Sequence, residues 1–125
     1  MKQVKVGIMP LKEFQAYTKA IVTGKHKRKR GEPQIWFSSM ASFAQVLSDQ
    51  NRELLSLIAE QKPESITELA RLSSRSQSNL TRTLKKMESY SLVKMKTGTR
   101  GSKQPFVPYS DIVLDMSIGS NAQRA

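Results

Sequence analysis

Residues 65–88 read SITELARLSSRSQSNLTRTLKKME, and they predict two short helices joined by a polar turn. Ser65 and Glu68 have the spacing of a capping box, in which a hydroxyl and a carboxylate satisfy unpaired amides at the start of a helix. The pair follows Pro63 and precedes apolar residues, so a helix is expected to begin here. Residues 73–75 are too polar to continue its apolar face and are expected to form the turn.

The second helix is expected to have a buried side and a polar, basic side. Ser76 can cap it, and Leu80, Leu84 and Met87 recur at the spacing of an apolar helical face. The opposite side has no acidic residue before Glu88, whereas a solvated helix usually mixes both charges. An ordinary amphipathic helix is the alternative, but Arg, Gln, Ser and Thr side chains can pair with base edges in the major groove. The DNA contacts predicted on this helix and its turn are Arg75, Ser76, Gln77, Ser78, Asn79, Thr81, Arg82 and Lys85.

A β-hairpin with a basic tip is expected after these helices. Residues 92–97 alternate as a strand, and residues 98–103 form a glycine-bounded basic loop. The next alternating segment, residues 111–118, is expected to complete the order of a winged helix-turn-helix. Lys96, Arg100 and Lys103 would then reach a neighbouring phosphate or the minor groove.

The N-terminal part predicts a strand, a helix and a basic arm. Residues 2–9 alternate as a strand, and an amphipathic helix is expected between Pro10 and Gly24. The residues at helical spacing on its expected apolar face are Leu11, Phe14, Thr18, Ile21 and Val22. A short buried strand is expected within residues 34–38, followed by a helix capped by Ser39. Ser48-Asp49 is expected to cap a further helix from Asn51 to Gln61. The arm is either a solvated linker or a phosphate contact, with equal weight given to each. Its basic residues are Lys25, Lys27, Arg28, Lys29 and Arg30.

Charge and composition limit the function classes. The net charge of +11 in 125 residues predicts attraction to polyanions, nucleic acid above all. Cysteine is absent and His26 is the single histidine, so we expect no metal site and no cofactor. The carboxylates are scattered, which argues against a nuclease or another enzyme. No segment has the apolar length of a signal peptide or membrane span, so a cytoplasmic location is expected.

The helical segment resembles a known class of regulators. Residues 66–70 (ITELA), residues 76–88 (SQSNLTRTLKKME) and the closing Leu92-Val93 are similar to the helix-turn-helix of ArsR- and MarR-type winged-helix proteins. The whole chain, with residues 4–7 (VKVG) and 36–39 (WFSS), resembles a family of small prokaryotic DNA-binding proteins. Some of these are antitoxins paired with a TumE-type toxin.

Two departures limit what the resemblance implies. Ser91 stands where the family commonly has glycine, so either a serine adopts a left-handed conformation or the helix ends differently. ArsR-type metal sensing requires Cys or His clusters, which this chain does not contain, and that activity is not implied.

These observations predict an α+β fold, a winged helix-turn-helix with an N-terminal strand–helix extension. The expected divisions are residues 1–33 for the strand, helix and arm, 34–118 for the winged domain and 119–125 for a flexible tail. The leading hypothesis is a transcriptional regulator, a repressor or autoregulator, that binds double-stranded DNA as a homodimer built mainly from residues 1–50. The alternative is an antitoxin that neutralises a small toxin by protein–protein binding, with DNA binding as autoregulation.

Overall fold

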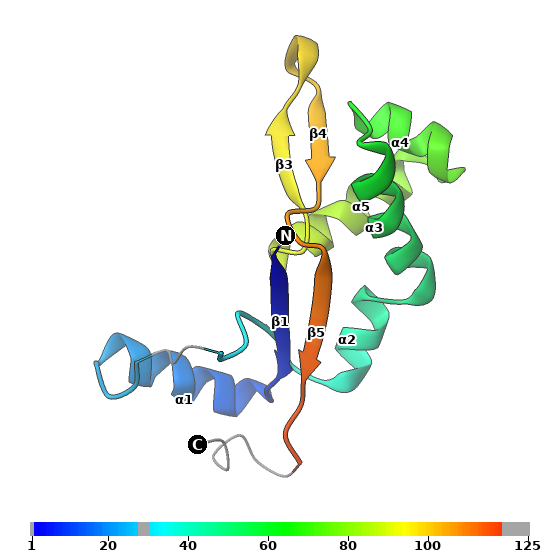
Figure 1. The fold of residues 1–125 in the computed structure, drawn as a ribbon. Coiled ribbons are helices and arrows are strands. Elements are labelled where there is room, and N and C mark those ends of the chain that lie inside the picture. The colour runs from blue at the N-terminus through cyan, green and yellow to red at the C-terminus, as the bar shows by residue number, and fades with distance from the viewer. Residues whose placement is uncertain (1, 28–30, 119–125) are drawn as a thin grey trace. The chain divides into compact units, whose positions relative to one another are not determined.

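The computed structural model describes residues 2–27 and 31–118, and within them the fold is α+β, as the sequence predicts. The chain divides into two compact units (Figure 1). The first contains residues 1–45 together with 111–125, and the second contains residues 46–110. Three of the arm residues, at positions 28–30, and the expected tail at 119–125 lie outside the described residues.

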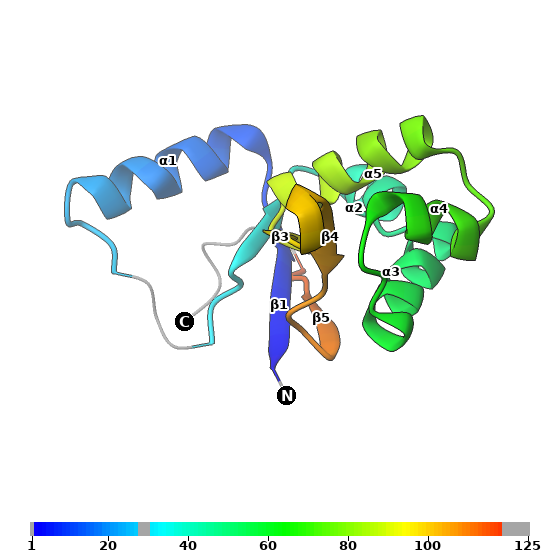
Figure 2. The ribbon, with the colours of Figure 1, turned by 90° about the horizontal axis from the view of Figure 1, so that it is seen from above.

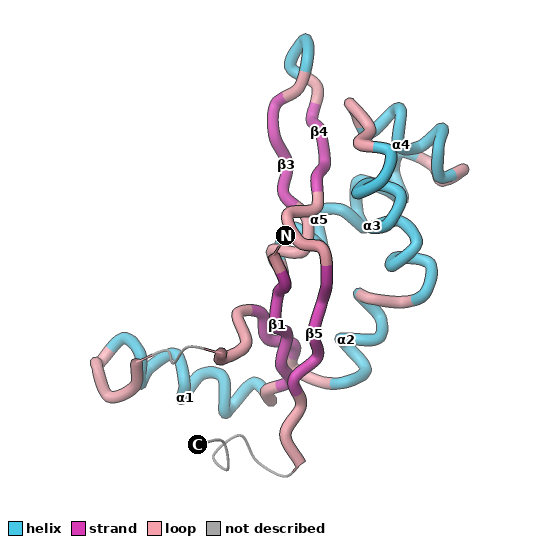
Figure 3. The backbone as a smooth tube through the Cα atoms, viewed as in Figure 1, coloured by secondary structure: helices cyan, strands magenta, loops and turns pink. Residues whose placement is uncertain are grey.

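The first unit is organised around a parallel sheet of three strands (Figure 3). β1 (Gln3–Ile8) lies in the centre, between β2 (Ile35–Phe37) and β5 (Asp111–Asp115). In register, Val6 is opposite Ile35 on one side and Leu114 on the other. Val4 and Val6 are fully buried, which explains why the alternation of β1 is so clear in the sequence.

The pairing of β5 corrects one expectation. Residues 111–118 were expected to return beside residues 92–97, but β5 pairs with β1 instead, and it ends at Asp115. The strand that does return is β4 (Lys103–Phe106), which contains Pro105. Alternation marks a strand without naming its partner, and a parallel partner can lie far away in sequence. Proline is tolerated in β4 because that strand has only one neighbour in its two-stranded sheet.

Helix α1 (Leu11–Val22) begins after Pro10 as predicted, but none of its residues is buried. Leu11, Phe14 and Val22, which were expected to form its apolar face, are exposed. The segment after the helix is held near it by Glu32, which accepts a hydrogen bond from the Tyr17 hydroxyl (3.1 Å) and lies 2.9 Å from His26 Nε2. α1 therefore presents Leu11, Phe14 and Val22 to solvent within this unit, while Tyr17 and Ile21 are half-buried.

Helix α2 (Met40–Val46) follows β2 closely. The Ser39 hydroxyl accepts a hydrogen bond from the Ser42 amide (3.0 Å), which confirms the expected cap. Phe43 packs edge-to-face on Phe37, with ring centroids 5.4 Å apart. This aromatic contact joins the helix to the sheet of the first unit.

The second unit contains three helices and a hairpin. α3 (Asp49–Gln61), α4 (Ile66–Ser73) and α5 (Gln77–Ser89) are grouped together (Figure 2), and they are followed by β3 (Lys94–Thr97) and β4. Between the two strands, residues 99–101 form a short 3-10 turn. The core of this unit is formed by Leu54, Leu55, Ile58, Leu69, Leu80, Leu84, Met87, Leu92 and Val93.

Serine hydroxyls begin all three helices. Ser48, Ser65 and Ser76 accept hydrogen bonds from the amides of Asn51, Glu68 and Asn79 at 3.2, 3.0 and 3.1 Å. The capping box differs in one detail, because Glu68 Oε2 accepts from the Glu64 amide rather than from Ser65. Local sequence signals therefore located these helices correctly.

Candidate nucleic-acid interface

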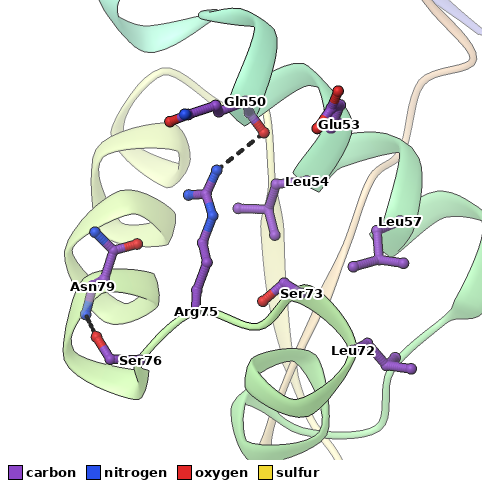
Figure 4. Close-up of a pocket in the computed structure, with 9 residues that line it drawn as sticks. All are labelled: Gln50, Glu53, Leu54, Leu57, Leu72, Ser73, Arg75, Ser76 and Asn79. Atoms are coloured by element: carbon purple, nitrogen blue, oxygen red, sulfur yellow. Dashed lines mark hydrogen bonds between the residues drawn. The ribbon is translucent and has the colours of Figure 1, made fainter.

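The turn between α4 and α5 is fixed by side chains at both of its ends. Ser74 adopts a left-handed conformation (φ 59°), and Ser76 then caps α5. Between them, Arg75 points toward α3, where Nη2 donates to the Gln50 carbonyl (3.0 Å) (Figure 4). Nη1 donates to Asn51 Oδ1 (3.2 Å). The contact of Arg75 with DNA stays a prediction, and in the structure its guanidinium connects the turn to α3.

Two more predicted contacts have roles inside the unit. The Gln77 side-chain amide donates to Thr67 Oγ1 (3.1 Å), which connects α5 to α4. Asn79 is half-buried and lines a pocket beside Arg75 (Figure 4). Arg75 and Gln77 can contact DNA only if they break or share their present hydrogen bonds.

A polar stripe remains exposed along α5. Ser78, Arg82 and Lys85 are exposed, and Thr81 is exposed while its hydroxyl donates to the Gln77 carbonyl (2.8 Å). Neither Arg82 nor Lys85 forms an ion pair with another described residue. The apolar side of the same helix is buried as predicted, so the stripe is the side of α5 that faces away from the core of this unit.

The hairpin adds three predicted basic residues to this unit. Lys96, Arg100 and Lys103 are all exposed, and the Lys96 ammonium lies 5.4 Å from the centre of the Phe106 ring. The Gly98 amide donates to the Ser102 carbonyl (2.6 Å) and closes the tip. Arg100 itself adopts a left-handed conformation (φ 60°) in this tip.

The charges of the second unit are strongly polarised along the sequence. Residues 75–103 contain eight Lys and Arg against the single acid Glu88, whereas residues 46–74 contain five acids against three bases. Two of the eight, Lys86 and Lys94, are exposed and were missing from the predicted contacts. A count of Lys and Arg over the whole of α5 and the hairpin, and not only over one stripe of α5, would have identified these two lysines. The field of this segment favours a polyanion.

The basic arm belongs to the first unit. Lys25 and Lys27 are exposed, while His26 is held by its contact with Glu32. The His26 ring is thus in contact with Glu32 of its own unit. Lys25 and Lys27 are the described arm residues that can contact a phosphate or an acidic partner.

Two kinds of feature are absent from the described residues. No helix in residues 2–27 and 31–118 is long and apolar enough to cross a membrane. In that same part of the chain, no group of three or more His, Asp or Glu side chains could hold a metal ion.

A model of the HVO_A0114 family matches residues 46–114, more than half of the chain. The chain belongs to the HVO_A0114 family. The part shared with the HVO_A0114 family contains α3, α4, α5 and the hairpin, and it therefore includes the exposed stripe and the hairpin bases. No curated protein matches the chain.

Proposed function

We propose that this protein is a sequence-specific transcriptional regulator that binds double-stranded DNA through a winged helix-turn-helix. In this proposal α4, the turn and α5 are the helix-turn-helix, and the β3–β4 hairpin is the wing. The observation that carries the proposal is the concentration of eight bases against one acid over residues 75–103, combined with an α5 stripe that has no carboxylate partner.

The chemistry of each side chain indicates whether it would contact a base edge or a phosphate. Arg82 can donate two hydrogen bonds to a guanine edge, and Ser78 and Thr81 can donate to or accept from either base pair. Phosphate contacts would come from flexible cationic side chains, namely Lys85, Lys86 and the Lys and Arg residues of the hairpin. α5 would then read sequence in the major groove while the wing fixes its position on the duplex.

Regulation would follow from occupancy of a promoter. One recognition helix covers only a few base pairs, so a twofold pair of chains reading two half-sites is the arrangement that supplies specificity. A repressor or autoregulator is the simplest outcome, because a bound dimer excludes other proteins from the same DNA.

The test uses a duplex selected from a random pool by the wild-type chain. Arg82→Ala is expected to weaken binding to that duplex by roughly 1–3 kcal/mol and to leave binding to a scrambled duplex nearly unchanged. Arg52→Ala is the matched control, because Arg52 is exposed on α3 and paired with Asp49. Equal losses on both duplexes would place Arg82 among the phosphate contacts and remove the proposed sequence reading by this residue.

A second candidate is an antitoxin role, and α1 is the observation that favours it. α1 has 12 residues, none of which is buried, and isolated helices of this length are marginal in water. Its exposed Leu11, Phe14 and Val22 therefore predict a protein partner, with Lys12, Lys19 and the arm lysines favouring an acidic one.

Co-purification with the product of the adjacent gene tests the antitoxin role. The double variant Leu11→Ser/Phe14→Ser should lose that partner, whereas the exposed Gln15→Ser should keep it. Retention of the partner by the double variant would exclude α1 as the neutralising surface.

A further inference from the structure

A pocket of about 760 Å³ lies in the second unit, among α3, α4 and the start of α5 (Figure 4). Its apolar wall is Leu54, Leu57 and Leu72, of which Leu54 is buried and the other two are half-buried. Its polar lining comes from Gln50, Glu53, Ser73, Arg75, Ser76 and Asn79. The lining is therefore mostly polar, with one apolar wall of three leucines, so the pocket suits a ligand that has one polar end and one apolar end.

Arg75 is the one cation in the lining of the pocket, and Glu53 is the one anion there. A guanidinium offers five N–H donors, and the two bonds that Arg75 makes go to neutral oxygens, an amide on Asn51 and the backbone carbonyl of Gln50. It forms no ion pair with any carboxylate in the described part of the chain. A half-buried guanidinium is better satisfied by a carboxylate than by these acceptors.

Ser73 supplies a second and independent signal. Its hydroxyl oxygen is buried and has no hydrogen-bond partner among the described residues. A buried polar group left unpaired is unfavourable, and rotation of the Ser73 side chain into the pocket would let a ligand oxygen pair its hydroxyl. Arg75 and Ser73 are therefore both donors that lack an anionic acceptor within the same cavity.

The remaining lining restricts the ligand further. Glu53 is exposed on the pocket lining and would repel a second negative charge, so a monoanion fits better than a dianion. The three leucines favour an aliphatic or aromatic body of a few carbons. A phosphate ester, which carries more charge and no requirement for the leucines, fits less well.

We propose that this pocket binds a small organic monocarboxylate, with its carboxylate on Arg75 and Ser73 and its apolar body on the three leucines. Arg75 belongs to the turn that precedes α5, so the carboxylate competes with Asn51 and Gln50 for the guanidinium. Binding therefore alters the contact between the turn and α3. Where the proposed DNA binding holds, ligand and DNA affinities are linked, and each changes the other by the same factor.

The site is tested on the full chain by titration with 4-methylpentanoate, followed by amide chemical shifts in the ¹⁵N-labelled protein. Saturable shifts are expected at residues 51–57 and 72–79 with a dissociation constant on the order of 1 mM, and the uncharged 4-methylpentanamide should bind at least about tenfold more weakly. Equal binding of acid and amide, or no saturable shift in these ranges, would overturn the proposal.

Variants separate the site from a nonspecific effect of charge. Arg75→Gln should weaken 4-methylpentanoate at least about tenfold, and Arg71→Gln, an exposed arginine on α4 outside the pocket, should not. If Arg75→Gln loses its dispersed spectrum, Ser73→Ala is used, and a loss of about threefold or more is expected. Unchanged affinity in a folded Arg75 or Ser73 variant would refute the assignment.

The linkage has its own readout. Affinity for the selected duplex, measured with and without saturating 4-methylpentanoate, should differ by about fivefold or more in the wild type and remain constant in Arg75→Gln. Ligand binding with unchanged DNA affinity would refute the linkage but support the site. If the chain binds no duplex at all, the proposed function fails, while the chemical shifts still decide the site.

Discussion

Replacement of Gly7 by alanine should weaken the first unit, because the indole of Trp36 lies directly over that glycine. An added Cβ would lie 2.4 Å from Trp36 Cζ3, 2.7 Å from Cε3 and 2.9 Å from Pro33 Cγ. Carbon atoms in good contact are about 3.5–4.0 Å apart, so the ring must retreat by about 1 Å. Pro33 is fully buried and limits that retreat.

Two opposing effects set the magnitude. Inserting a methyl group into a packed site costs roughly 1–3 kcal/mol, whereas alanine is intrinsically better than glycine in a strand by about 0.5–1 kcal/mol. The net loss in the free energy of unfolding is therefore about 0–2.5 kcal/mol, with a midpoint of about 1 kcal/mol. The displacement of the Trp36 ring is also expected to disturb Tyr17, whose ring centroid lies 5.7 Å from that of Trp36 and whose hydroxyl donates to Glu32.

Urea unfolding followed by tryptophan emission measures this loss, because Trp36 is the single tryptophan in the chain. The midpoint should fall in Gly7→Ala, and the emission maximum of the folded variant should shift as the ring moves. Gln3→Ala, at an exposed position of the same strand, is the matched control and should change little. An unchanged or higher midpoint in Gly7→Ala would show that the ring rearranges freely and would refute the packing argument.

Three further outcomes are expected. Ser91→Gly should stabilise the second unit by roughly 0.5–1 kcal/mol, because Ser91 has a left-handed φ of 61° after α5. Ser56→Gly, within α3, is the control and should destabilise the unit. A thermal unfolding experiment that ranks the two variants in the opposite order would contradict the idea that Ser91 is strained. Neutralising the arm should make the salt dependence of DNA binding shallower. The slope of the logarithm of the binding constant against the logarithm of the salt concentration should change by about 0.9 for each phosphate that the arm contacts in the wild type. An unchanged slope would assign the arm to a protein partner or to no role in binding. That variant replaces Lys25, Lys27, Arg28, Lys29 and Arg30 by glutamine. Light scattering at micromolar concentration should give a dimer mass, and Phe14→Ser should lower it; a monomer mass that persists with DNA would exclude the dimer and favour a toxin-like partner.

Local signals in the sequence were sufficient for the helices of the second unit. Ser48, Ser65 and Ser76 each cap a helix at the predicted place, because a cap depends on hydrogen bonds that span only three residues. The apolar face of α5 was equally predictable from its spacing. The left-handed Ser91 was one of two alternatives that its position allowed.

Features set by distant segments were not predictable. The pairing of β5 with β1 joins residues more than a hundred positions apart, and alternation carries no information about such a partner. The direction of Arg75 depends on α3, which approaches only in the folded unit. The exposure of Leu11 and Phe14 was missed because helical periodicity shows that a face is apolar and not what covers it.

The parallel pairing of β5 with β1 also constrains how the chain can be made. Residues 46–110 are contiguous and can fold as soon as they leave the ribosome. β5 is synthesised more than a hundred residues after β1, so Val4 and Val6 must wait for that stretch of translation before their surroundings are complete. At about 5–20 residues per second that wait lasts several seconds. During this interval the open edge of β1 is exposed to other chains, and a nascent N-terminal segment is the part of this protein most in need of a chaperone.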